Sequence, residues 1–304
     1  MPLAVSAAVQ LAWHEITLVV FTALAPSGIL ACVICVLALM APRCVGLQSD
    51  EGARTRLSHL LALPLAVSMV GLVASASHLG TPSNALYVLS GIGRSPLSNE
   101  VACCVLFTAF TGLYWLYSFS AKQRPWLCRT WRFAIVLAGL AAVVSISLAY
   151  SAETILTWSH WSVPVSLCCS ALGGAPLLAL VTARLAKVDV APMAAKCLLV
   201  CGIVGALACA AACLCWWDWA GGARNAVVMS ARDLVPAQPL LIFVYTLLAL
   251  GAYAMTMREL RRATSRGAHT RASRLAIACA LYFAGLFALR FVFYMTHMTV
   301  GISL

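Results

Sequence analysis

Charged residues are scarce in this chain of 304 residues: they make up 10% of it, and only nine residues are acidic. A soluble globular protein carries roughly 25% charged residues, which it needs to cover a water-facing surface. The polar stretches between the apolar blocks are also short. The composition therefore excludes a soluble globular protein, and it leaves no room for a separate water-soluble domain.

Apolar residues, by contrast, make up 63% of the sequence and gather in eight long blocks. A bilayer is crossed by a helix of about 20 such residues. The blocks lack the alternation of barrel strands, and backbone groups in hydrocarbon must pair internally, so helices are predicted. We expect an all-α, polytopic integral membrane protein that forms a single transmembrane domain over residues 1–304, with helices at about 14–40, 57–77, 98–119, 131–151, 162–186, 192–217, 238–258 and 274–298.

A faint internal repeat suggests two four-helix halves. The first expected helix contains Pro26-Ser27-Gly28, and the fifth contains Gly173-Gly174-Ala175-Pro176. Each motif follows a tryptophan and a histidine at the start of its helix. Small residues at such points let helices approach closely in a membrane.

Basic residues account for the net charge of +11, and they occupy alternate loops. This is the positive-inside pattern. It predicts a multi-pass protein of the bacterial cytoplasmic (inner) membrane, with both termini and the loops after helices two, four and six outside. The same placement argues against a nucleic-acid partner. The inner set holds sixteen of the twenty basic residues: Arg43, Arg54, Arg56, Lys122, Arg124, Arg129, Arg132, Arg184, Lys187, Lys196, Arg258, Arg261, Arg262, Arg266, Arg271 and Arg274.

Ionisable residues at the predicted outer edge are candidates for function, because such residues are costly near hydrocarbon. His78 ends the second helix and Glu100 opens the third. Glu100 has an alternative interpretation as a cap residue, since a carboxylate in a first helical turn is favoured by the helix dipole. His14 lies at the same edge. Interfacial placement in a wet loop explains three further residues there better than function does: Glu153, His160 and Asp218.

Arg290 is embedded in the last apolar block and needs an anionic or carbonyl partner. The acidic residues of the outer edge are within plausible reach. His297 follows seven residues later, nearly two helical turns, so the two side chains share a face. Both are therefore candidates for the same site as His78.

Metal and haem sites are not expected. A haem held by two histidines across a membrane needs them on facing helices at membrane depth, whereas all six histidines lie at helix ends or in loops. The fourteen cysteines lie mostly inside apolar blocks and lack the closely spaced runs of iron–sulfur ligands. Free cysteine behaves there as a small buried hydrophobe.

Several motifs resemble the membrane-anchor subunit of the dimethyl sulfoxide reductase family, which is related to the NrfD and polysulfide reductase anchors. The sequence opens with Trp13-His14-Glu15 and closes with Arg290, Tyr294 and His297-Met298-Thr299-Val300-Gly301. Between the second and third helices stand His78-Leu79-Gly80-Thr81-Pro82 and Gly91-Ile92-Gly93-Arg94-Ser95-Pro96-Leu97-Ser98-Asn99-Glu100. The likeness runs from end to end, although the intervening helices match only in hydrophobicity.

The resemblance implies a membrane anchor that holds a molybdopterin catalytic subunit and a four-cluster iron–sulfur subunit, and that oxidises menaquinol. The quinol-site histidine and acid of the family fall on His78 and Glu100, with His14, Arg94, Arg290 and His297 as further lining. Menaquinol is then a mobile substrate, and the anchor needs no bound cofactor. Catalysis on the terminal substrate belongs to the catalytic subunit.

Two other functions remain open. A secondary transporter has a similar number of helices, but its substrate contacts gather near the midplane at broken helices. A purely structural anchor lacks quinol chemistry altogether. Quinol-dependent reduction by the assembled complex separates it from the quinol-oxidising anchor.

Overall fold

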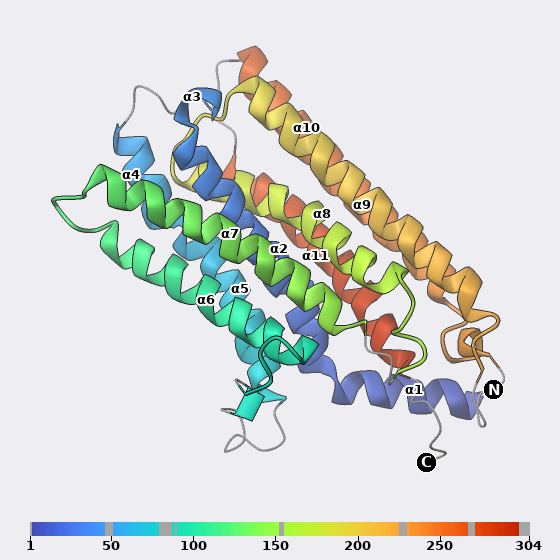
Figure 1. Ribbon diagram of the computed structural model, residues 1–304. Helices are drawn as coiled ribbons and strands as arrows, with labels where there is room; N and C mark the ends of the chain where they lie inside the picture. The colour runs from blue at the N-terminus through green and yellow to red at the C-terminus, as the bar shows by residue number, and fades with distance from the viewer. Residues whose placement is uncertain are drawn as a thin grey trace.

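The computed structural model describes residues 2–45, 51–78, 87–88, 90–151, 155–224, 230–266 and 271–297. Within these residues, eight helical segments are long and apolar enough to cross a membrane, so the all-α, multi-pass fold is confirmed (Figure 1). Each corresponds to one expected block. They are α2 (Ile16–Met40), α4 with α5 (Glu51–Leu60 and Ala62–Ser77), α6 (Pro96–Tyr117), α7 (Pro125–Ala149), α8 (Ser162–Leu185), α9 (Pro192–Ala220), α10 (Gln238–Arg266) and α11 (Ala272–Met295).

The helix α1 (Pro2–His14) was not predicted as a separate element. Figure 1 shows it lying across one end of the bundle, at an angle to the spans. It packs against α11 and the short 3-10 helix η2 (Ala231–Leu234), and its Ala8 and Ala12 are buried. Glu15 separates α1 from α2, so the backbone turns there from the end of the bundle into its centre. At the opposite end, α2 is followed by the short helix α3 (Pro42–Val45).

The centre of the bundle is formed by α2 and α8. Of the most apolar stretch of each span, 67% is buried in α2 and 78% in α8, against 22–50% in the other six. A Cβ atom added to Gly174 of α8 would lie 2.6 Å from the hydroxyl oxygen of Ser27 in α2. The two small-residue motifs of the predicted repeat therefore meet each other.

The same motifs also pack each central helix against its successor. A Cβ atom on Gly28 would lie 2.6 Å from the backbone nitrogen of Ser68 in α5, and one on Gly205 of α9 would lie 2.8 Å from the backbone nitrogen of Gly173. Helices at such short distances gain dispersion contacts, which replace the hydrophobic effect as the driving force inside a membrane. This packing positions α5 against α2, and α5 ends at Ser77, directly before His78.

Candidate functional site

His78 and Glu15 form the centre of the candidate site. The Nε2 atom of His78 lies 3.2 Å from Oε2 of Glu15, and 38% of the histidine side chain is exposed against 19% of the glutamate side chain. His78 follows the last residue of α5, and Glu15 precedes α2. The close packing of α2 on α5 thus carries both residues to the same end of the bundle, where an acid and a base meet at the edge of the apolar core.

Glu100 lies at the same end, in α6, and is only 5% exposed. The helix begins at Pro96, two residues earlier than expected, and its first turn contains no acidic residue. The interpretation of Glu100 as a cap residue is therefore wrong. No side-chain hydrogen bond to Glu100 is found among the described residues. A buried carboxyl group without a structural partner is costly, which makes it a candidate for function.

The connection before Glu100 is folded tightly against the start of α6. Gly93 has a φ angle of +83°, and its backbone N–H donates a hydrogen bond of 2.6 Å to Oδ1 of Asn99. A Cβ atom on Gly91 would lie 2.5 Å from the hydroxyl oxygen of Ser98. The positive φ angle of Gly93 lies in the left-handed region, which glycine adopts more easily than other residues. The glycines of the Gly91–Glu100 motif therefore shape the turn that sets Glu100 at the edge of the bundle.

Tyr150, the residue after α7, lies near both carboxyl groups. Burial raises the pKa of its hydroxyl well above the usual value, and neighbouring Tyr294, Glu100 and Glu15 raise it further. Its ring lies 6.1 Å from that of Tyr294, whose hydroxyl donates a hydrogen bond of 3.2 Å to the carbonyl oxygen of Leu18. A neutral phenol thus lies within electrostatic reach of both acids, although no direct contact joins His78 to Glu100 among the described side chains.

His297 lies on the far side of this aromatic cluster. Its ring is 5.2 Å from that of Trp158, which is itself 5.5 Å from the ring of Tyr150. Burial lowers the pKa of His297, and the carboxylate of Glu15 acts in the opposite direction. His297 is therefore packed against the aromatic cluster and lies within electrostatic range of Glu15, with no direct contact to it among the described side chains.

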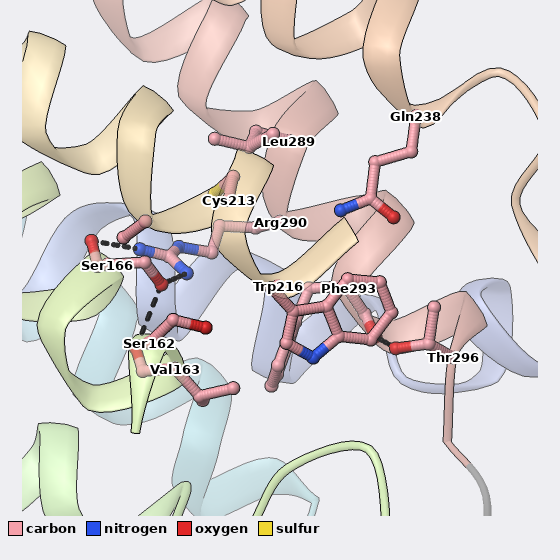
Figure 2. A pocket seen from close by; sticks show the side chains of 11 residues that line it. Ser162, Val163, Ser166, Cys213, Trp216, Gln238, Leu289, Arg290, Phe293 and Thr296 are labelled. Atoms are coloured by element: carbon pink, nitrogen blue, oxygen red, sulfur yellow. Dashed lines mark hydrogen bonds between the residues drawn. The ribbon is translucent and has the colours of Figure 1, made fainter. Parts of the chain in front are cut away.

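Arg290 occupies a separate cavity between α8, α9, α10 and α11 (Figure 2). It is 1% exposed, and its guanidinium donates hydrogen bonds to the Ser166 carbonyl (3.0 Å), the Ser166 hydroxyl (3.4 Å) and the Ser170 hydroxyl (2.6 Å). The sequence predicted either a carbonyl or an anionic partner for Arg290, and the Ser166 carbonyl is such a partner. Among the described residues, no acidic side chain lies within 4.0 Å of the Arg290 guanidinium. The cavity has a volume of about 20 Å³, room for one water molecule. The structure does not bring Arg290 into contact with His78 or Glu100.

The remaining candidates lie at the surface. His14 and Arg94 are exposed. His160 stacks on Trp219, with ring centroids 4.7 Å apart, and its Nδ1 atom is 2.7 Å from the hydroxyl oxygen of Ser162. Partial burial lowers the pKa of His160. Asp218 pairs with Arg232 at 3.3 Å. These contacts agree with interfacial roles for His160 and Asp218, whereas Glu153 and residues 79–86 lie outside the described residues.

Three residues that the structure adds to the site carried only a weak signal in the sequence. Glu15 was only the third residue of the opening Trp13-His14-Glu15 motif, and its contact with His78 depends on the turn between α1 and α2. Tyr150 ends an apolar block and belongs to no motif. Thr17, on the first turn of α2, has a buried hydroxyl oxygen with no hydrogen-bond partner among the described residues. Among all the residues that the structure describes, no group of three or more histidine, cysteine, aspartate or glutamate residues could hold a metal ion.

Residues 9–298 match the sequence model of the family described as "DMSO reductase anchor subunit (DmsC)". The anaerobic dimethyl sulfoxide reductase chain YnfH of Escherichia coli (strain K12) is 28% identical over 295 residues, which are 96% of this protein and 98% of the relative. The C subunit of the anaerobic dimethyl sulfoxide reductase of the same organism is 28% identical over 303 residues, with the same coverage. The corresponding C subunit of Haemophilus influenzae is 30% identical over 147 residues, 48% of this protein and 50% of the relative.

Proposed function

The chain belongs to the DMSO reductase anchor subunit family, and on that premise we propose that it binds menaquinol at the His78–Glu15 end of the bundle and oxidises it there. Family membership makes it the membrane anchor of a molybdenum oxidoreductase complex, with a catalytic subunit and an iron–sulfur subunit as partners. The finer proposal is that the iron–sulfur subunit carries four clusters and receives the electrons. Reduction of the terminal substrate belongs to the molybdopterin subunit.

The observation that carries the proposal is the distance of 3.2 Å between His78 Nε2 and Glu15 Oε2. Oxidation of a quinol breaks two O–H bonds and releases two protons and two electrons. In the proposed tautomer the Nε2 atom, which lies 3.2 Å from the Glu15 carboxyl group, carries the ring proton, so the Nδ1 atom can accept a proton from a quinol hydroxyl. The carboxylate then stabilises the imidazolium that forms. Because His78 is 38% exposed, it can release this proton to water.

Glu100 is the proposed acceptor of the second proton. Its burial at 5% exposure keeps it out of bulk water, and Tyr150 lies near both Glu100 and Glu15. Two acceptors in different surroundings suit a reaction that releases two protons in turn. Protons leave to the outside, given the proposed orientation with both termini outside, and the two electrons leave to the iron–sulfur subunit docked over the same end.

We further propose that this subunit works without haem, iron–sulfur cluster or other metal, because quinol is a mobile substrate and the protein needs only to bind it and accept its protons. A reduced-minus-oxidised absorption spectrum of the purified subunit tests this. The expected spectrum has no b-type haem bands, and stoichiometric haem would refute the proposal.

The decisive experiment compares two activities of the assembled complex in membranes: reduction driven by menaquinol, and reduction driven by an artificial dye that bypasses the anchor. His78→Ala should lower the first by about 100-fold, the lower end for removal of a general base, and leave the second unchanged. His160→Ala is the matched histidine control and should leave both activities close to normal.

The outcome also separates the two alternative functions. Full quinol activity in His78→Ala would show that the site is elsewhere. A native complex with dye-linked activity but no quinol-linked activity would indicate a purely structural anchor. A secondary transporter would require solute uptake independent of the other two subunits.

A further inference from the structure

An apolar groove lies between α2, α5, α8 and α11, in the half of the bundle away from the candidate site. It has a volume of about 410 Å³. Its floor is formed by Leu24 of α2 and by α8, and its walls by α5 and α11. The wall residues are Leu63, Ala66, Val67 and Val70 on α5 and Ala276, Cys279, Ala280 and Phe283 on α11, with Leu178 and Val181 of α8 below them.

On the α5 wall, the helix face that lines the groove continues beyond it to Ser77, the residue before His78. Leu63, Val70 and Ser77 follow one another at intervals of seven residues, so they lie on one face of the helix. Ser77 is exposed and is the last residue of α5, next to His78. His78 lies eight positions after Val70, which corresponds to about 12 Å along the helix axis. The groove therefore stops two turns short of the His78–Glu15 pair.

On α2 and α11, the residues between the groove and the His78 end of the bundle are polar or aromatic. Thr17 lies seven residues before Leu24, on the same face of α2, and its buried hydroxyl oxygen has no hydrogen-bond partner among the described residues. On α11, Phe287 follows Ala280 at the same interval, and Phe291 one turn later packs edge-on against Trp13, with ring centroids 5.3 Å apart. The helix faces that line the groove thus continue toward the end of the bundle that carries an unpartnered hydroxyl and an acid–base pair.

We propose that this groove holds the isoprenoid tail of the quinol whose ring lies at His78, a proposal that rests on the function proposed above. The occupant must be a molecule with one polar end and a long apolar tail, and the polar end must match a base, an acid and a hydroxyl. A quinol has both parts. A tail in lipid is already in an apolar medium, so the groove gains little from the hydrophobic effect. Its contribution is contact packing, which orients the ring toward His78.

The test uses two valines of α5 with nearly equal exposure. Val70 lines the groove and is 55% exposed, whereas Val73 is not part of its lining and is 60% exposed. Each is replaced by tryptophan in the whole complex, and reduction is driven either by menaquinol with its long tail or by menadiol, which has the same ring and no tail. Val70→Trp should raise the KM for menaquinol roughly tenfold, equivalent to about 1.4 kcal/mol of binding, and leave the KM for menadiol unchanged. Val73→Trp should change neither KM.

Each other outcome overturns the proposal in a recognisable way. If Val70→Trp leaves both KM values unchanged, the groove holds membrane lipid and not the quinol tail. If it impairs both quinols equally, the substitution acts on the ring site or on assembly. His78→Ala measured with menadiol separates the two proposals: loss of menadiol oxidation supports the ring site whether or not the groove holds the tail, and full menadiol oxidation refutes the proposed function itself.

Discussion

The carboxylate of Glu15 lies 3.2 Å from the imidazole of His78, so the turn between α1 and α2 is joined to the last turn of α5 by a pair of ionisable groups. The residue that orients the proposed proton acceptor is therefore supplied by the first turn of the bundle, and not by the helix that carries the histidine.

Glu15→Gln should weaken this orientation without removing the base. Once His78 is protonated the two residues form a partly exposed ion pair, which is worth up to about 1 kcal/mol, so quinol-linked turnover should fall roughly fivefold. Glu15→Asp should restore part of it, because the charge returns at a longer distance. Turnover with menaquinol and with the dye is measured in parallel. Asp218→Asn is the control, since Asp218 is 94% exposed. Equal activity in Glu15→Gln and the native complex would contradict the role of the pair.

Glu100→Gln keeps the shape of the side chain but cannot carry a proton. We expect kcat for menaquinol to fall by about 100-fold with little change in KM, since the lost step is proton transfer and not binding. Glu51→Gln at the start of α4, on the other side of the bundle, is the matched control. A rise in KM at constant kcat would show instead that Glu100 contributes to quinol binding.

Arg290→Lys should damage assembly and not quinol chemistry. Lysine keeps the charge but loses the planar fork that reaches Ser166 and Ser170 at once. The lost hydrogen bonds are worth about 1.5–3 kcal/mol, so the thermal unfolding midpoint of the detergent-solubilised complex should fall. Quinol-linked and dye-linked activities should fall together. Exposed Arg129→Lys should change neither property. Selective loss of quinol-linked activity at an unchanged midpoint would place Arg290 in the quinol site.

The orientation is tested with truncated proteins fused to alkaline phosphatase, which is active only outside the cytoplasmic membrane. A fusion after Gly93, in the connection before α6, should be active, and one after Lys122, in the connection after it, should be inactive. The basic residues of alternate loops are the reason. The opposite pattern of activity would show that the bundle has the inverse orientation. Equal activity of both fusions would show that α6 does not cross the membrane.

The spans could be predicted from the sequence because each is a long block bounded by charge, proline or glycine. The separate helix α1 could not. Residues 2–13 are mostly apolar, like the span that follows, and neither proline nor glycine stands at the turn; the polar pair His14-Glu15 was the available signal. The first expected helix accordingly began near the right residue, at 14 instead of 16, while the element before it was missed.

The site was predicted in part. His78 and Glu100 were placed at one end because helix ends follow from the spans. Their partners depend on how the helices are rotated about their axes, which a single apolar block does not reveal. Arg290 illustrates this: its partners Ser166 and Ser170 stand four residues apart on α8, a spacing that presents two hydroxyls on one face, but nothing in the sequence says that α8 faces α11.

The crossing of α2 and α8 at Ser27 and Gly174 has a consequence for biosynthesis. The ribosome delivers α2 first, and its small-residue face has no partner of its own until three further spans have been made and α8 follows. Until then α2 can pack against α5, through Gly28, and against α7, but the face that α8 covers remains in contact with lipid. The first half of the protein therefore cannot reach its final packing during its own synthesis, and the arrival of α8 completes the centre of the bundle.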